Sequence, residues 1–85
     1  MTLRFFAKLD DNNTVETVIV IDSDNLLDEN GKESETVGQA YIASIGLEGK
    51  YVQTFKNRTA RGNLAGIGMI YDPIKDEFID SIAVI

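Results

Sequence analysis

The 85-residue sequence contains neither cysteine nor histidine. Without cysteine, disulfides, zinc–thiolate sites and thiol nucleophiles are excluded. Without histidine, the chain lacks the usual general base and the commonest transition-metal ligand. The sequence therefore predicts a protein that is not an enzyme and that uses no metal or cofactor.

Long apolar runs are also missing. No segment approaches the roughly 20 apolar residues of a membrane helix. The opening MTLRFFAKLDD is too short and too regularly alternating for a signal peptide. With 44% hydrophobic and 26% charged residues, the composition is that of an ordinary globular chain. We expect a single small domain over residues 1–85, without a membrane partner.

The net charge of −6 is unevenly distributed. Between residues 10 and 48, every charged side chain except Lys32 is acidic, whereas residues 49–71 contain bases and no acid. This asymmetry can give one face a positive potential on an acidic body. The alternative is that two solvated loops differ in sign.

The first two segments with strand patterns predict a β-hairpin. LRFFAKL, residues 3–9, alternates in hydrophobicity, which is typical of a half-buried strand. TVETVIVID, residues 14–22, is rich in β-branched residues. Its apolar residues fall on both faces, which predicts a central strand. Between the two lies DDNN, a cluster of turn-forming residues.

A helical period over residues 35–45 predicts one helix. The apolar residues at helical spacing are Val37, Ala40, Tyr41 and Ile45. Ser34 suits the N-cap, and Gly46 suits the position after the helix, where the chain takes a left-handed conformation. Gly38 lies inside the segment and weakens the helix.

The C-terminal half has strand patterns again, in KYVQTFK, IGMIYD and EFIDSIAVI. The prediction is mainly β (α+β by element count), with one helix inserted between strands 2 and 3. The strands form either a small, strongly bent five-stranded antiparallel sheet or a partly open, Sm-like barrel.

Three glycines, Gly62, Gly66 and Gly68, raise the question of a phosphate-binding loop. Such a loop opens onto a helix N-terminus and usually carries a lysine. Here a strand pattern follows and the lysine is missing. Glycines in this setting more often mark a bulge or a sharp bend, so we interpret them as bending the chain.

Several phrases together resemble a family of small, uncharacterised or virion-associated proteins of tailed marine phages, especially cyanophages. They are FFAKLDDNNTVETVIVID, NLLDENGKESE, YVQT, RGNLAGIG and YDPIKDEFI. The resemblance covers about residues 5–79, and the ending DSIAVI departs from the proline-rich, aromatic tail of the family. It implies a non-enzymatic role in the virion or in the cytoplasm of an infected host cell, and it assigns no catalytic residue.

The acidic loop after the second strand is a candidate calcium-binding loop. Counted from Asp22, the acids and amide at positions 1, 3, 7, 9 and 12 match several ligand positions of an EF-hand loop. Leu26 and Leu27 stand where a ligand and the turn glycine are required, and a strand precedes the loop. We interpret the two leucines as a plug into the core, and whether the loop holds a cation stays open. Neighbouring acids such as Asp76 and Glu77 are expected to be solvated.

Two surfaces are candidates for partners. A basic segment interleaved with aromatic residues favours single-stranded RNA or DNA binding as the alternative function. Its residues are Lys50, Tyr51, Phe55, Lys56, Arg58 and Arg61. The apolar end of the chain favours a homo-oligomer through a C-terminal edge strand. Its interface residues are Ile82, Ala83, Val84 and Ile85. The leading interpretation is a phage virion-associated or assembly protein that acts as a homo-oligomer and also contacts other virion proteins.

Overall fold

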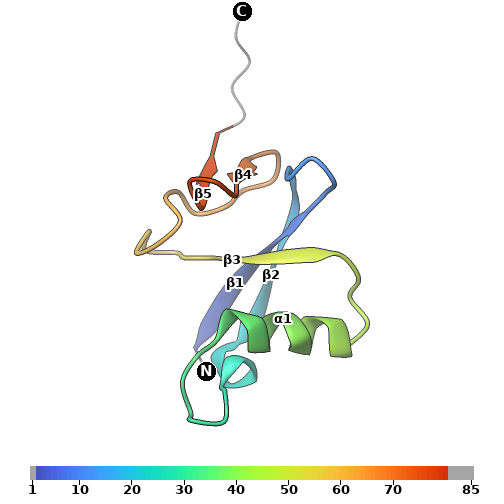
Figure 1. Cartoon of the computed structure of the whole chain (residues 1–85), viewed down its shortest axis with the longest axis vertical. Helices are drawn as coiled ribbons and strands as arrows, with labels where there is room; N and C mark the ends of the chain where they lie inside the picture. The colour runs from blue at the N-terminus through green and yellow to red at the C-terminus, as the bar shows by residue number, and fades with distance from the viewer. Residues whose placement is uncertain (1, 81–85) are drawn as a thin grey trace, which may run out of the picture.

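The computed structural model describes residues 2–80 and contains two small sheets, one α-helix and one 3-10 helix (Figure 1). In chain order the elements are β1 (Leu3–Leu9), β2 (Val15–Asp22), η1 (Ser23–Leu26), α1 (Glu35–Ser44), β3 (Lys50–Thr54), β4 (Ile70–Asp72) and β5 (Glu77–Ile79). The expectation of a mainly β chain with one α-helix is confirmed. No helix of residues 2–80 is long and apolar enough to cross a membrane.

The strands do not form one five-stranded sheet or a closed barrel. β1, β2 and β3 form an antiparallel sheet in the order β2-β1-β3, and β4 pairs with β5 separately. The chain leaves the first sheet after Thr54, and the isolated bridge between Thr14 and Ile70 connects the two sheets. The predicted single sheet is thus divided because the stretch between β3 and β4 is irregular.

The prediction that β2 is central is wrong, because β2 lies at an edge and β1 is the central strand. The apolar residues on both faces of β2 have another cause. Val18 packs against the core on one face of the sheet, and Ile19 packs against the core on the other. The pattern therefore reflects a sheet covered on both faces and not a strand with two neighbours.

Alternate residues of β1 enter two separate cores. Phe6 is fully buried on the helix side, in a cluster with Ile21, Leu26, Ile42 and Tyr51. Ala7 and Leu9 are buried on the opposite side, in a cluster with Val15, Val52, Ala65 and Phe78. The half-buried strand expected here is instead buried on both faces over this stretch, because α1 covers the Phe6 side.

The helix begins at Glu35 as predicted and ends at Ser44, one residue before the predicted end. Ser34 is the N-cap, and its side-chain oxygen accepts a hydrogen bond from the backbone N–H of Val37 at 3.4 Å. Gly46 follows the C-cap with a φ of 88°. Gly38 has a packing role: a Cβ there would lie 2.7 Å from Phe6 Cζ and 3.0 Å from Leu26 Cγ. This glycine lets α1 approach β1 and η1 closely.

The glycine-rich stretch turns the chain towards β4 and precedes no helix. Gly62 and Gly68 have φ values of 68° and 90°, in the left-handed region that glycine enters without penalty. Both lie in the irregular connection and not in a strand, since β4 begins at Ile70. The bend is therefore present, but at Gly68 it falls within residues 67–72, where the sequence predicts a strand, and β4 begins only at Ile70.

Candidate functional site

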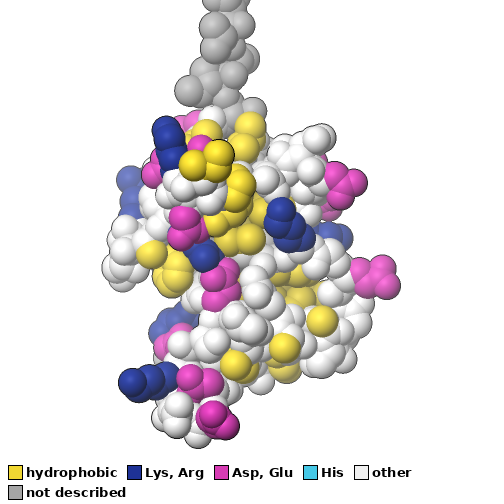
Figure 2. Space-filling view, viewed as in Figure 1, with side chains coloured by type: hydrophobic (Ala, Val, Ile, Leu, Met, Phe, Trp, Pro, Cys, Tyr) yellow, Lys and Arg dark blue, Asp and Glu magenta, His cyan; other side chains and the backbone are white. Residues whose placement is uncertain are grey.

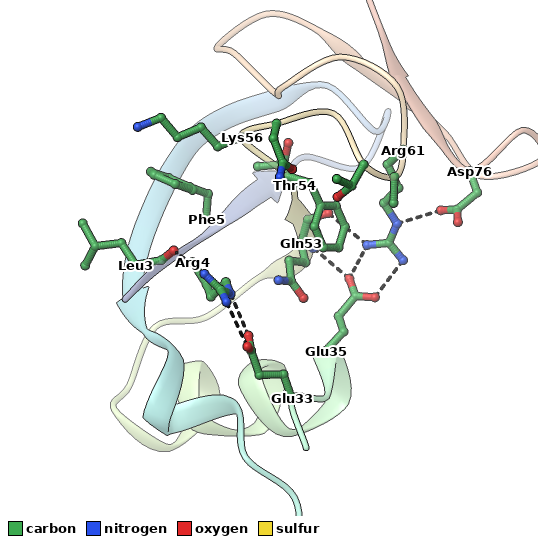
Figure 3. A pocket seen from close by; sticks show the side chains of 14 residues that line it. Leu3, Arg4, Phe5, Glu33, Glu35, Gln53, Thr54, Lys56, Arg61 and Asp76 are labelled. Atoms are coloured by element: carbon green, nitrogen blue, oxygen red, sulfur yellow. Dashed lines mark hydrogen bonds and ion pairs between the residues drawn. The ribbon is translucent and has the colours of Figure 1, made fainter. Parts of the chain in front are cut away.

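An open groove of about 930 Å³ lies beside the N-terminal end of β1 (Figure 3). It exists because β3 is shorter than β1. The last residue of β3, Thr54, pairs with Phe5, so Leu3 and Arg4 have no partner on β3. The chain then turns away at Phe55, whose carbonyl accepts a hydrogen bond from Arg58 N–H at 3.0 Å.

One wall of the groove is built around Arg61. Its guanidinium donates to Glu35 Oε2 at 2.5 Å and to Glu35 Oε1 at 2.7 Å. It also donates to Asp76 Oδ1 at 2.9 Å and to the carbonyl of Gln53 at 3.0 Å. The hydrogen bonds that Arg61 donates to Glu35 raise the pKa of Arg61. Because the Arg61 side chain is only 17% exposed, this cation is a fixed link between elements and not a mobile surface charge.

The same groups close the outer edge of β3. Glu35 Oε2 accepts a hydrogen bond from Gln53 N–H at 2.7 Å, and Arg61 donates to the Gln53 carbonyl. Further along, Gln39 Nε2 donates to the carbonyl of Tyr51 at 2.7 Å. Unpaired backbone groups on an edge strand attract other strands. Side chains of α1 and of the connection occupy these groups on β3.

Tyr71 joins this wall to the second sheet. Its hydroxyl donates a hydrogen bond to Asp76, and its ring centroid lies 6.0 Å from Arg61 Cζ. The ring also contacts Phe78, with the two centroids 5.1 Å apart. Burial, together with the hydrogen bond to Asp76, raises the pKa of Tyr71 to about 12. The phenol therefore stays protonated at neutral pH and holds the Asp76 carboxylate in place.

The other wall carries a second ion pair. Arg4 Nε lies 2.6 Å from Glu33 Oε1, and Arg4 Nη2 lies 2.9 Å from Glu33 Oε2. The bidentate contact with Arg4 lowers the pKa of Glu33. Both side chains are more exposed than the Arg61–Glu35 pair, so this contact is the weaker of the two.

The remaining lining consists of apolar side chains, uncharged polar side chains and one lysine. Phe5 and Phe55 are half-buried and Leu3 is 47% exposed. Lys56 is exposed, and within residues 2–80 no carboxylate lies within 4 Å of its ammonium group. The groove thus combines an aromatic and aliphatic surface with walls whose charges are already paired.

The basic segment predicted to bind nucleic acid is only partly assembled here. Phe55, Lys56 and Arg61 line the groove, whereas Lys50, Tyr51 and Arg58 do not. Tyr51 is buried in the helix-side core, and Lys50 donates to Asn13 Oδ1 at 2.7 Å. On the face drawn in Figure 2, the described Lys and Arg side chains are interspersed with Asp and Glu and form no continuous basic patch there.

The carboxylates of Asp22 and Asp28 in the acidic loop accept hydrogen bonds from nearby backbone N–H groups. Asp22 Oδ1 accepts from Asp24 N–H at 3.0 Å, and Asp28 Oδ1 accepts from Asn30 N–H at 2.8 Å. Within residues 2–80, no three acidic side chains gather as a metal site would require. The plug interpretation is right for Leu26, which is fully buried.

The interpretation that both leucines plug into the core is wrong for Leu27, because its side chain is 42% exposed. It lies just beyond the end of η1, as its C-cap, with an extended backbone. Asp76 is exposed, as expected, and it also accepts hydrogen bonds from both Arg61 and Tyr71.

Sequence reasoning missed the Glu35–Arg61 pair, because nothing local in the sequence links residues 26 positions apart. The predicted interface residues Ile82, Ala83, Val84 and Ile85 lie outside the described range, so that prediction stays open.

A scan against protein-family models finds no match to this chain, and searches of curated proteins and of solved structures find none either.

Proposed function

We propose that the chain is a non-enzymatic interaction module, a virion-associated or assembly protein of a tailed phage that acts as a homo-oligomer. In this proposal the groove beside β1 receives an extended segment of another virion protein. The observation that carries it is an apolar surface in the groove, flanked by walls whose charged side chains form ion pairs with each other.

The groove offers a peptide both backbone and side-chain contacts. Beyond the end of β3, the edge of β1 at Leu3 and Arg4 has no strand beside it. An extended peptide can pair with such an edge and place alternate side chains into flanking pockets. Phe5 and Phe55 are the surfaces against which an apolar side chain of that peptide would pack.

The carboxylates that line the groove accept hydrogen bonds from other side chains of the protein, which supports a binding role. Both oxygens of Glu35 accept hydrogen bonds from Arg61. Asp76 accepts from Arg61 and from Tyr71, and Glu33 accepts from Arg4. A general acid or base needs to exchange a proton with a substrate, and these carboxylates are held by cations instead.

The test is incorporation into phage particles. Particles of the encoding phage would be purified and assayed for the chain by mass spectrometry, with a Phe5→Ser variant as the probe. Ile74→Ser, at a residue 94% exposed in the turn between β4 and β5, is the matched control. We expect the chain in particles, with incorporation reduced by Phe5→Ser alone. Expression in infected cells without incorporation contradicts the proposal.

The alternative function is single-stranded RNA or DNA binding of the Sm-like kind through the basic segment. The observation in its favour is that Lys56 and Arg58 are exposed, with no carboxylate within 4 Å among residues 2–80, beside the half-buried Phe55. Fluorescence anisotropy with a single-stranded oligonucleotide tests it. Binding should weaken steeply with salt, and it should be lost in Lys56→Glu but kept in Lys75→Glu. No binding at low salt ends this alternative.

A further inference from the structure

The two outer edges of the three-stranded sheet differ in how far their backbone groups are hydrogen-bonded. The edge of β3 is closed by side chains of Gln39, Glu35 and Arg61. On β2, only Val15 bonds outward, with its N–H to Met69 and its carbonyl to the N–H of Gly68. Within residues 2–80, no side chain or loop bonds to the backbone of residues 16–22 apart from the pairing with β1. The edge of β2 is thus open.

Over residues 17–21 the open edge also lacks the features that usually guard one, because the bulge of β2 lies at Glu16. Residues 17–21, TVIVI, are all β-branched and contain no charge and no proline. Exposed edges are normally protected by lysine, proline, bulges or inward-pointing charges. Val20 is 48% exposed, lies directly opposite Phe5 of β1, and adjoins the exposed Leu3 on the same face of the sheet.

We propose that β2 pairs antiparallel with β2 of a second copy of this chain, about a two-fold axis perpendicular to the sheet. The two copies then share one continuous antiparallel sheet. This inference rests on the homo-oligomer of the proposed function and names its interface. A second copy fits because the chain carries a net charge of −6, and the uncharged stretch at residues 17–21 is a place where two copies can meet without like charges facing each other.

The charges and contacts of the edge also select the register. Centring the pairing on Ile19 places Glu16 opposite Asp22 of the other copy, and like charges directly opposite destabilise a strand pair. Centring it on Val18 places Ile21 opposite Val15, whose outward groups are already bonded to the connection before β4. Centring it on Val20 avoids both problems.

In that register, Val20 lies opposite Val20 of the second copy, and Ile19 lies opposite Ile21 of the second copy. β-branched cross-strand pairs of this kind stabilise antiparallel sheets. Because Phe5 lies beside Val20, the pairing also joins two half-exposed apolar surfaces into one stripe across the dimer. The interface is isologous, as expected for a two-fold dimer.

The first test is the mass in solution of the full chain and of two lysine variants, by light scattering at tens of micromolar. Val20→Lys places two ammonium groups opposite each other at the centre of the pairing. Ile67→Lys makes the same change at a residue 77% exposed in the connection before β4. We expect twice the chain mass for the full chain and for Ile67→Lys, and a single chain mass for Val20→Lys with an unchanged far-UV CD spectrum.

The second test uses the absence of cysteine, because a single introduced thiol can report the contact. Directly opposite Cβ atoms in an antiparallel pair lie about 4.5–5.5 Å apart, near the range that a disulfide spans. We expect Val20→Cys to form a disulfide-linked dimer under mild oxidation. Ile67→Cys is expected to remain a monomer on non-reducing gels. Equal cross-linking of the two variants overturns the proposal.

The outcomes separate this interface from the wider proposal. A dimer that survives Val20→Lys overturns the β2 interface and leaves the homo-oligomer. The same conclusion follows if the dimer disappears when residues 82–85 are removed and Val20→Cys does not cross-link. A full chain of single mass overturns both the interface and the homo-oligomer. Incorporation into phage particles is measured independently and is unaffected by either result.

Discussion

Glu35 and Arg61 are 26 residues apart in sequence, yet the carboxylate accepts two hydrogen bonds from the guanidinium, at 2.5 and 2.7 Å. Glu35 opens α1, and Arg61 also binds Asp76 in the turn between β4 and β5. Glu35 further accepts from the backbone of Gln53 in β3. One ion pair therefore ties the helix, the first sheet and the second sheet together.

Replacing Glu35 by alanine should destabilise the protein by about 2 kcal/mol, the loss expected for charge-assisted hydrogen bonds in a partly buried pair. The substitution also leaves Gln53 N–H without its acceptor. Urea unfolding followed by far-UV CD measures the effect. Glu33→Ala is the control, because its pair with Arg4 is exposed and should cost below about 1 kcal/mol. Equal losses in the two variants would contradict the linking role of Glu35.

Gly38→Ala should also destabilise the protein, although alanine is the better helix former by about 1 kcal/mol. The new Cβ would lie 2.7 Å from Phe6 Cζ and 3.0 Å from Leu26 Cγ, so the core must shift. Overpacking of this kind typically costs about 1–3 kcal/mol. Thermal unfolding should show a lower Tm for Gly38→Ala than for the unaltered chain.

A second substitution identifies the cause of that loss. Phe6→Leu removes the ring that the new methyl group meets, so Gly38→Ala should cost less in the Phe6→Leu background than in the original one. A double-mutant cycle measures this coupling. If Gly38→Ala costs the same in both backgrounds, strain elsewhere in α1 and not contact with Phe6 is responsible.

Local features of the fold could be predicted from the sequence. The β-branched run before Asp22 forms β2, and Ser34 and Gly46 bound the helix as their side chains and backbone preferences require. Each of these depends on residues within a few positions of one another. The role of Gly38 could not be predicted, because the reason for it is the ring of Phe6, 32 positions earlier.

The arrangement of the sheets and the groove depend on long-range contacts. An apolar pattern on both faces of β2 was interpreted as a central position, but Val18 and Ile19 are covered by layers above and below an edge strand. Arg61 stood in the basic segment as a candidate for phosphate. Its position inside the fold pairs it with Glu35 instead, and no sequence pattern joins them.

The raised pKa of Tyr71 predicts a loss of stability in strong alkali. Folding moves this pKa from 10.0 to about 12, so the folded state favours the protonated phenol. This contribution is fully present below pH 10 and is lost as the pH rises through 12. Urea unfolding at pH 9 to 12 measures it. Tyr71→Phe should reduce the slope over this interval, and an unchanged slope would exclude Tyr71 as its source.

The adjacent leucines Leu26 and Leu27 provide a matched pair of substitutions. Leu26 is fully buried between α1 and β1, whereas the Leu27 side chain is 42% exposed. Leu26→Ala leaves a cavity beneath the helix and should cost about 2–5 kcal/mol. Leu27→Ala removes the same atoms from a partly solvated position and should cost below about 1 kcal/mol. Urea unfolding of both variants tests the difference. Because the two residues share sequence context and helix propensity, a similar cost for each would mean that Leu26 does not hold α1 against the sheet.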